Sequence, residues 1–163
     1  MFDDLLQANA AYAENFGLGH LKPEARRTLA LLTCMDSRIE PLAMLGLQPG
    51  DAKIVRNAGG RATDDALRSL VLASNLLGVT RIAVMHHTGC AMISTNDAIA
   101  TKVGDALGVP SPDWDFHPID DPVLTLRADV AAVRACPLIP ATTTVTGWVY
   151  DTSTGEIAVV VAP

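Results

Sequence analysis

The sequence has no long apolar run and few positive charges, and both absences limit what the protein can bind. No stretch reaches the ~18 consecutive apolar residues of a membrane-spanning helix, so we expect no membrane segment. Lys and Arg total 12 against 18 Asp and Glu, which gives a net charge of −6. An acidic chain repels phosphate backbones and anionic lipid, so we expect neither nucleic acid nor a membrane as a partner. The first residues carry acids where a signal peptide carries Lys or Arg, which predicts a cytoplasmic protein.

Cysteine is scarce as well, and three cysteines cannot all pair with one another. In a reducing cytoplasm such residues are more often buried thiols, metal ligands or nucleophiles than bridge partners. Cys136 precedes a proline and has no histidine or acid beside it in sequence, so we expect no function for it. Disulfides are not needed, because a chain of this length buries roughly 70% of the surface that its unfolded form exposes. We expect one domain over residues 1–163.

Short apolar runs alternate with amphipathic stretches along the chain, a pattern typical of an α/β fold. We expect a mostly parallel central sheet flanked by helices, with an antiparallel edge near the C-terminus. Residues 1–22 are predicted to form an N-terminal helical arm that packs at a subunit interface. Thr63 is the expected N-cap of the central helix, and Gly78 its stop. Strands are predicted at 28–34, 52–56, 81–86, 143–150 and 156–161, and helices at 41–45, 63–77, 91–107 and 123–135.

Three of the predicted strands end in residues that carry chemistry. The first ends at Cys34, the second at the pair 56–57 (Arg-Asn), and the third at the pair 86–87 (His-His). In open α/β sheets, ligands bind outside the carboxyl ends of the strands. The coincidence therefore predicts a functional site at this edge of the sheet.

Cys34, His87 and Cys90 form a candidate metal site. Zinc accepts thiolate and imidazole ligands in tetrahedral geometry, and a catalytic zinc keeps its fourth position open. Taken singly, each motif has an ordinary explanation: a cysteine ending a strand is often a small buried hydrophobe, and an Asp-x-Arg sequence such as Asp36-Ser-Arg38 is often a surface ion pair. Their occurrence together at strand ends favours a metal centre.

Cys-x-Asp-x-Arg (34–38), Arg-Asn-Ala-Gly (56–59) and His-Thr-x-Cys (87–90), in this order, resemble the motifs of the β-carbonic anhydrases, in particular the compact bacterial members. The resemblance covers most of the chain. It implies Zn²⁺ bound by Cys34, His87 and Cys90, and reversible hydration of carbon dioxide to bicarbonate by a zinc-bound hydroxide. It further implies a homodimer or a higher even oligomer. One position departs from the family pattern, because Ala91 replaces the glycine that usually follows the second cysteine.

The resemblance gives Asp36 and Arg38 catalytic roles. Paired with Arg38, Asp36 would accept a hydrogen bond from the hydroxide; released from Arg38, it would occupy the fourth zinc position in a closed, inactive form. The backbone of Ala58 and Gly59 would border the substrate, although a tight turn before the next helix explains these small residues equally well. His86 should point away from His87 by strand alternation, which predicts a structural role for it.

Other functions remain compatible with the same residues. Carbonyl sulfide and carbon disulfide are linear molecules close to carbon dioxide in shape, so the ligand set does not separate a hydrolase of these substrates from a carbonic anhydrase. A purely structural zinc domain would use Asp36 as a permanent fourth ligand. A third interpretation makes Cys34 or Cys90 a nucleophile activated by His87.

Overall fold

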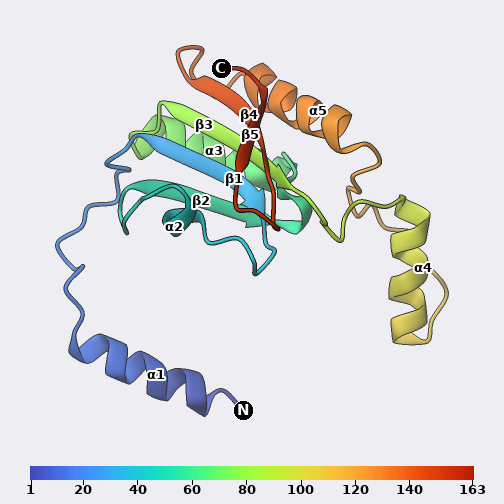
Figure 1. Cartoon of the computed structure of the whole chain (residues 1–163), viewed down its shortest axis with the longest axis horizontal. Coiled ribbons are helices and arrows are strands. Elements are labelled where there is room, and N and C mark those ends of the chain that lie inside the picture. The colour runs from blue at the N-terminus through green and yellow to red at the C-terminus, as the bar shows by residue number, and fades with distance from the viewer.

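The computed structural model describes residues 1–163 and contains a five-stranded sheet in the order β2-β1-β3-β4-β5 (Figure 1). The first four strands are parallel, and β5 is antiparallel to β4. The predicted mostly parallel sheet with an antiparallel C-terminal edge is thereby confirmed. The elements are α1 (Asp3–Glu14), β1 (Leu29–Cys34), α2 (Pro41–Met44), β2 (Ala52–Asn57), η1 (Ala58–Gly60), α3 (Asp64–Leu76), β3 (Arg81–His87), α4 (Asn96–Leu107), α5 (Pro122–Ala135), β4 (Thr144–Tyr150) and β5 (Ile157–Val161).

The two strands that carry the candidate ligands lie in the middle of the sheet. β1 and β3 pair in parallel over five positions, and nearly every residue of both is buried. A strand covered on both faces has a continuous apolar run, and the segments Leu-Ala-Leu-Leu and Ile-Ala-Val-Met have this composition. Because β1 and β3 are parallel neighbours, their carboxyl ends lie side by side.

Each face of the sheet has its own apolar core. One core combines alternate residues of β1 and β3 with α5 and with α3, which lies behind the strands in Figure 1, and includes Leu32, Leu70, Val84 and Leu126. The other core lies on the opposite face of the sheet, around Leu31 and Met85, and extends to both candidate cysteine ligands. The site therefore borders packed side chains that hold its strands in place.

The boundaries differ from the predicted ones where local backbone conformation decides them. β1 begins at Leu29 because Thr28 has a positive φ of 51°. α4 begins only at Asn96, where the hydroxyl of Thr95 accepts a hydrogen bond from the third residue of the helix. Thr63 does occupy the N-cap position of α3 but makes no side-chain cap bond. Gly78, with φ 72°, follows the last turn of α3, as predicted.

The first helix stands apart from the sheet (Figure 1). None of the residues of α1 is buried. Its large apolar side chains, and those on either side of it, are exposed by half or more: Phe2, Leu5, Leu6, Tyr12 and Phe16. No helix of the structure combines the length and hydropathy that a membrane span requires.

Candidate metal centre

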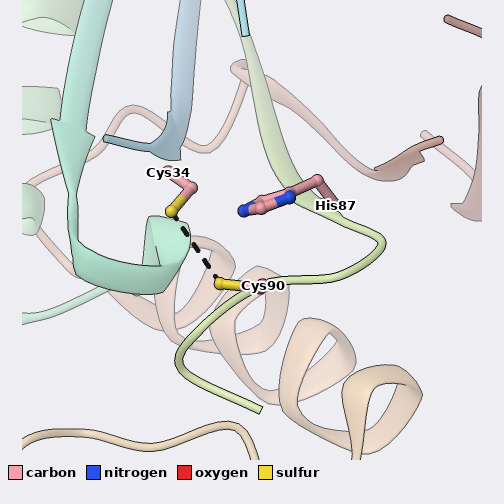
Figure 2. Close-up of side chains that lie close together, drawn as sticks. All are labelled: Cys34, His87 and Cys90. Atoms are coloured by element: carbon pink, nitrogen blue, oxygen red, sulfur yellow. Dashed lines mark hydrogen bonds between the residues drawn. The ribbon is translucent and has the colours of Figure 1, made fainter. Parts of the chain in front are cut away.

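The three predicted ligands converge at the carboxyl edge of the sheet. β1 ends at Cys34, β3 ends at His87, and Cys90 follows in the turn after β3. The two sulfur atoms lie 3.9 Å apart, and one ligand atom from each of the three residues lies within 4.8 Å of the others (Figure 2). All three residues are buried. The structure thus brings together the residues that the sequence suggested as metal ligands.

The imidazole of His87 is oriented by the backbone. Its Nδ1 lies 2.9 Å from the carbonyl oxygen of Thr88. Because a carbonyl only accepts, Nδ1 carries the proton and Nε2 presents a lone pair. Nε2 points toward the two sulfurs (Figure 2), and it is buried without a hydrogen-bond partner. Such orphaned buried atoms are rare and costly. A cation shared with two thiolates would satisfy Nε2, and this donor set is one that zinc accepts.

The two sulfur atoms are hydrogen-bonded to each other. The hydrogen bond from Cys90 lowers the pKa of Cys34 well below its ordinary value, and His87 adds to this effect. The same bond and burial raise the pKa of Cys90. Backbone N–H groups support negative charge on both sulfurs, from Gly59 to Cys34 Sγ at 3.3 Å and from Met92 to Cys90 Sγ at 3.5 Å. Because metal binding requires thiolates, a divalent cation would displace any proton that the two sulfurs carry.

Asp36 is held by Arg38 in a two-pronged ion pair. Nε donates to Oδ1 at 2.9 Å and Nη2 donates to Oδ2 at 2.7 Å, and the backbone N–H of Arg38 adds a third bond to Oδ1. These bonds hold the pKa of the Asp36 carboxyl far below its usual range, so it is ionised. Nη2 also donates to the carbonyl of Gly89 at 3.1 Å. Asp36 Oδ2 lies 3.8 Å from Nε2 of His87, so the carboxylate borders the cluster.

Arg56 binds the turn that presents Asp36. Its Nε donates to the carbonyl of Cys34 at 2.9 Å, and its Nη2 donates to the carbonyl of Asp36 at 2.6 Å. From the sequence, this strand end was expected to border the functional site, but no role was predicted for the arginine. The contacts show that it fixes the backbone on both sides of Met35.

Ala58 and Gly59 form a tight 3₁₀ turn after β2, together with Gly60. Gly59 has a φ of 81°, and a Cβ there would lie 3.3 Å from the side chain of Ile119 and 3.4 Å from that of Met92. The turn is therefore packed against the site and presents no side chain of its own at this position. Ala91 departs from the family pattern without strain, because it is exposed and is not among the residues with positive φ.

His86 points to the other face of β3, as alternation predicts, and reaches a carboxylate that no sequence pattern singled out. Its Nε2 lies 3.0 Å from Oδ2 of Asp129 in α5. Arg61 donates to the same oxygen from 2.8 Å. No motif contains this ion pair, and only the carboxylate's position within the apolar stripe of a helix could have indicated it. Cys136 lies outside the ligand cluster and is partly buried beside the α3–α5 core.

Comparison with known proteins agrees with this arrangement. A family model described as "Carbonic anhydrase" matches residues 29–108, the segment that contains all three candidate ligands. Beta-carbonic anhydrase 1 of Mycobacterium tuberculosis is 35% identical over 156 residues, covering 95% of this chain and 94% of that protein. A carbon disulfide hydrolase of Saccharolobus solfataricus is 34% identical over 185 residues, covering 96% of this chain and 89% of the relative.

Solved structures agree in fold as well. The crystal structure of carbonic anhydrase from Streptococcus mutans superposes with a TM-score of 0.89 and 41% identity, over 98% of this chain and 96% of the other. The similarity to the M. tuberculosis and S. mutans proteins extends over nearly the whole length of this chain and of each relative. The chain belongs to the β-carbonic anhydrase family.

Proposed function

We propose that the chain catalyses the reversible hydration of carbon dioxide to bicarbonate, with Zn²⁺ held by Cys34, His87 and Cys90. When bound, this ion supplies the Lewis acidity that makes water a nucleophile near neutral pH. The observation that carries the proposal is the buried, unpartnered Nε2 of His87, which faces two sulfurs 3.9 Å apart. Family membership supports the same reaction.

Asp36 and Arg38 are the proposed catalytic side chains. The ion pair keeps Asp36 ionised and aims it along the edge of the cluster, where it can accept a hydrogen bond from the reacting water and orient it. A carboxylate so close to the cluster has a second position available, as a fourth ligand. We assign this position to an inactive closed form, and Arg38 is the group that opposes it.

We further propose that Ala58 and Gly59 border the substrate. Gly59 places no side chain beside Cys34 Sγ, to which its N–H donates a hydrogen bond. Apolar side chains of Met92 and Ile119 lie next to the same glycine. A small, linear, uncharged molecule such as carbon dioxide suits this environment.

The metal and the reaction are tested together. Elemental analysis of the purified chain should give one zinc per chain, and stopped-flow assays should detect carbon dioxide hydration. Cys34→Ala should lose both, whereas Cys136→Ala is the matched control because Cys136 lies outside the cluster. Hydration by zinc-free protein would refute the metal site. Zinc-loaded protein that is inactive throughout the alkaline range would instead favour a structural zinc. Alkylation that abolishes activity while zinc stays bound would favour a cysteine nucleophile.

Hydrolysis of carbon disulfide or carbonyl sulfide is the second candidate. It is favoured by the S. solfataricus relative named carbon disulfide hydrolase, which is 34% identical and is matched over 89% of its own length. The same ligand set serves both reactions, so sulfide release and carbon dioxide hydration are to be measured side by side on one preparation. Sulfide release with the higher kcat/KM would reverse the assignment.

The N-terminal arm is proposed to pack on a partner subunit in a homodimer or a higher even oligomer. The arm exposes Phe2, Leu5, Leu6 and Tyr12 by more than half, and isolated domains rarely keep so many large apolar side chains together in water. Light scattering of the full chain and of a chain lacking residues 1–16 tests this proposal, with a fall in mass per particle expected. Three unpaired cysteines suit a reducing compartment, so we propose a cytoplasmic location.

A further inference from the structure

Asp129 is the only carboxylate buried in the structure, and it lies outside the ligand cluster. It accepts hydrogen bonds from Nε of Arg61 at 2.8 Å, from Nε2 of His86 at 3.0 Å and from the backbone N–H of Ala62 at 3.2 Å. Burying a charge is costly unless it is paired and hydrogen-bonded. Three donors from two segments therefore make this a built feature of the fold.

Arg61 extends the network to a further segment. Besides its bond to Asp129, its Nη1 donates to the carbonyl oxygens of His117, at 2.7 Å, and Pro118. Its main chain is fixed as well: its N–H donates to Oδ1 of Asn57 at 2.8 Å, and its carbonyl accepts from Nδ2 of Asn57 at 2.7 Å. One guanidinium thus joins the turn after β2, helix α5 and the loop before α5.

The turn after β2 and the loop before α5 each lead to one of the two cysteines. The turn carries Gly59, whose N–H donates to Cys34 Sγ. The loop continues to Ile119, whose N–H donates to the carbonyl of Met92 at 2.8 Å, and the N–H of Met92 in turn donates to Cys90 Sγ. Because the bond between Ile119 and Met92 joins two backbones, it transmits the position of the loop directly to the turn that holds the second cysteine.

Helix α5 leads to the third ligand through β3. Its Asp129 is bonded to His86 on one face of the strand, and the next residue, His87, presents Nε2 to the two sulfurs on the other face. A shift of His86 along or across the strand would therefore move His87 with it, because a single peptide unit joins them.

We infer that Arg61 and Asp129 are positioning residues for the metal centre, which hold the segments of all three ligands in the geometry that binds the ion. The inference rests on the proposed zinc site. Groups that orient metal ligands from outside the coordination sphere change metal affinity by about 10- to 100-fold when they are removed. The hydrogen bonds of Arg61 and Asp129 do not include the ligand atoms of Cys34, His87 or Cys90, so their effect passes through the backbone of the three segments.

Arg61→Lys is the first test. Lysine keeps the positive charge beside Asp129. Its single ammonium group cannot also donate to the two carbonyl groups that the planar guanidinium of Arg61 reaches. We expect zinc release from the holoenzyme to a chromogenic chelator to become about 10-fold faster or more. The thiolate-to-metal bands of the Co²⁺-substituted protein should shift as well. Arg68→Lys is the matched control, because Arg68 forms an exposed pair with Asp65, and it should release zinc at the wild-type rate.

A second variant separates positioning from stability. Arg61→Met combined with Asp129→Leu removes both charges together, so no unpaired charge is left buried, although Nε2 of His86 and the N–H of Ala62 lose their acceptor. We expect this variant to fold with a Tm a few degrees below that of the wild type. Measured well below both melting transitions, its zinc release should still be at least about 10-fold faster. Zinc release at the wild-type rate in both Arg61→Lys and the double variant would overturn the inference. If Arg61→Lys does not fold, a wild-type rate in the double variant alone would overturn it. A wild-type chain that binds no zinc would instead refute the proposed metal site itself.

Discussion

Gly60→Ala should damage the site through the backbone alone. Gly60 has a φ of 70°, and a Cβ built there lies 2.9 Å from the backbone N of Cys34, 2.9 Å from the carbonyl carbon of Thr33 and 3.0 Å from the carbonyl oxygen of Met85. All three atoms belong to the central strands β1 and β3, so no flexible side chain can move aside. The added methyl has to displace either the turn or the strand end that presents Cys34.

The magnitude can be separated into two parts with a control. A non-glycine residue in the left-handed region costs roughly 1–2 kcal/mol. Gly46 has a similar φ of 63° but nothing within 4 Å of its added Cβ, so Gly46→Ala should lose about that amount and no more. At Gly60 the overlap adds roughly 1–3 kcal/mol, as overpacking in a rigid core usually does. We therefore expect a total loss of about 2–5 kcal/mol for Gly60→Ala.

Urea denaturation of both variants, followed by elemental analysis for zinc, measures the two effects. Gly60→Ala should unfold at a lower urea concentration than Gly46→Ala and should retain less zinc, because the displaced atom is the backbone N of a candidate ligand. Equal losses of stability in the two variants would refute the packing argument. Full zinc content in a clearly destabilised Gly60→Ala would refute the link between this turn and Cys34.

The remaining predictions concern charged groups. Asp36→Ala should keep zinc but lose most carbon dioxide hydration, and full activity by stopped flow would contradict its proposed role. Arg38→Ala removes the bonds that lower the pKa of Asp36, so this pKa should rise toward its ordinary value in an NMR titration, and hydration should fall. Burial alone would raise the pKa of Asp129, but hydrogen bonds from His86 and Arg61 lower it overall. Its ionisation therefore stabilises the fold above about pH 4, and this contribution is lost as the pH falls through the folded-state pKa. The difference in Tm between wild type and Asp129→Asn should be full at about pH 6 and shrink toward about pH 3, whereas a constant difference would contradict the assignment.

The sheet and the ligand cluster were predictable because both depend on local composition and a simple topological rule. Two apolar runs end at Cys34 and His87, and parallel strands bring such ends to one edge of the sheet. His86 was expected on the opposite face for the same reason of alternation, and it contacts Asp129 there. These inferences needed only the composition of the strands, their alternation and the rule that parallel strands end at one edge of the sheet.

The contacts that support the cluster depend on tertiary packing, so the sequence does not reveal them. The partners Arg61 and Asp129 are 68 residues apart, and neither stands in a recognisable motif. The delayed start of α4 follows from a side-chain cap at Thr95, and the neighbouring Ser94 could have supplied the same kind of cap. At Thr63 the sequence predicts the N-cap position correctly, but the side chain makes no capping hydrogen bond there.

The strand order has a consequence for the assembly of the protein. Cys34 and His87 belong to strands that are neighbours in the sheet, yet β2 and α3 lie between them in sequence. Contacts between distant parts of a chain form slowly, because their loop-closure entropy must be overcome first. A metal ion would therefore meet a complete binding site only after β1 and β3 have paired, late in folding. Tight metal binding would then stabilise a sheet that has already formed. Chelators should therefore increase the unfolding rate of the protein more than they decrease its folding rate.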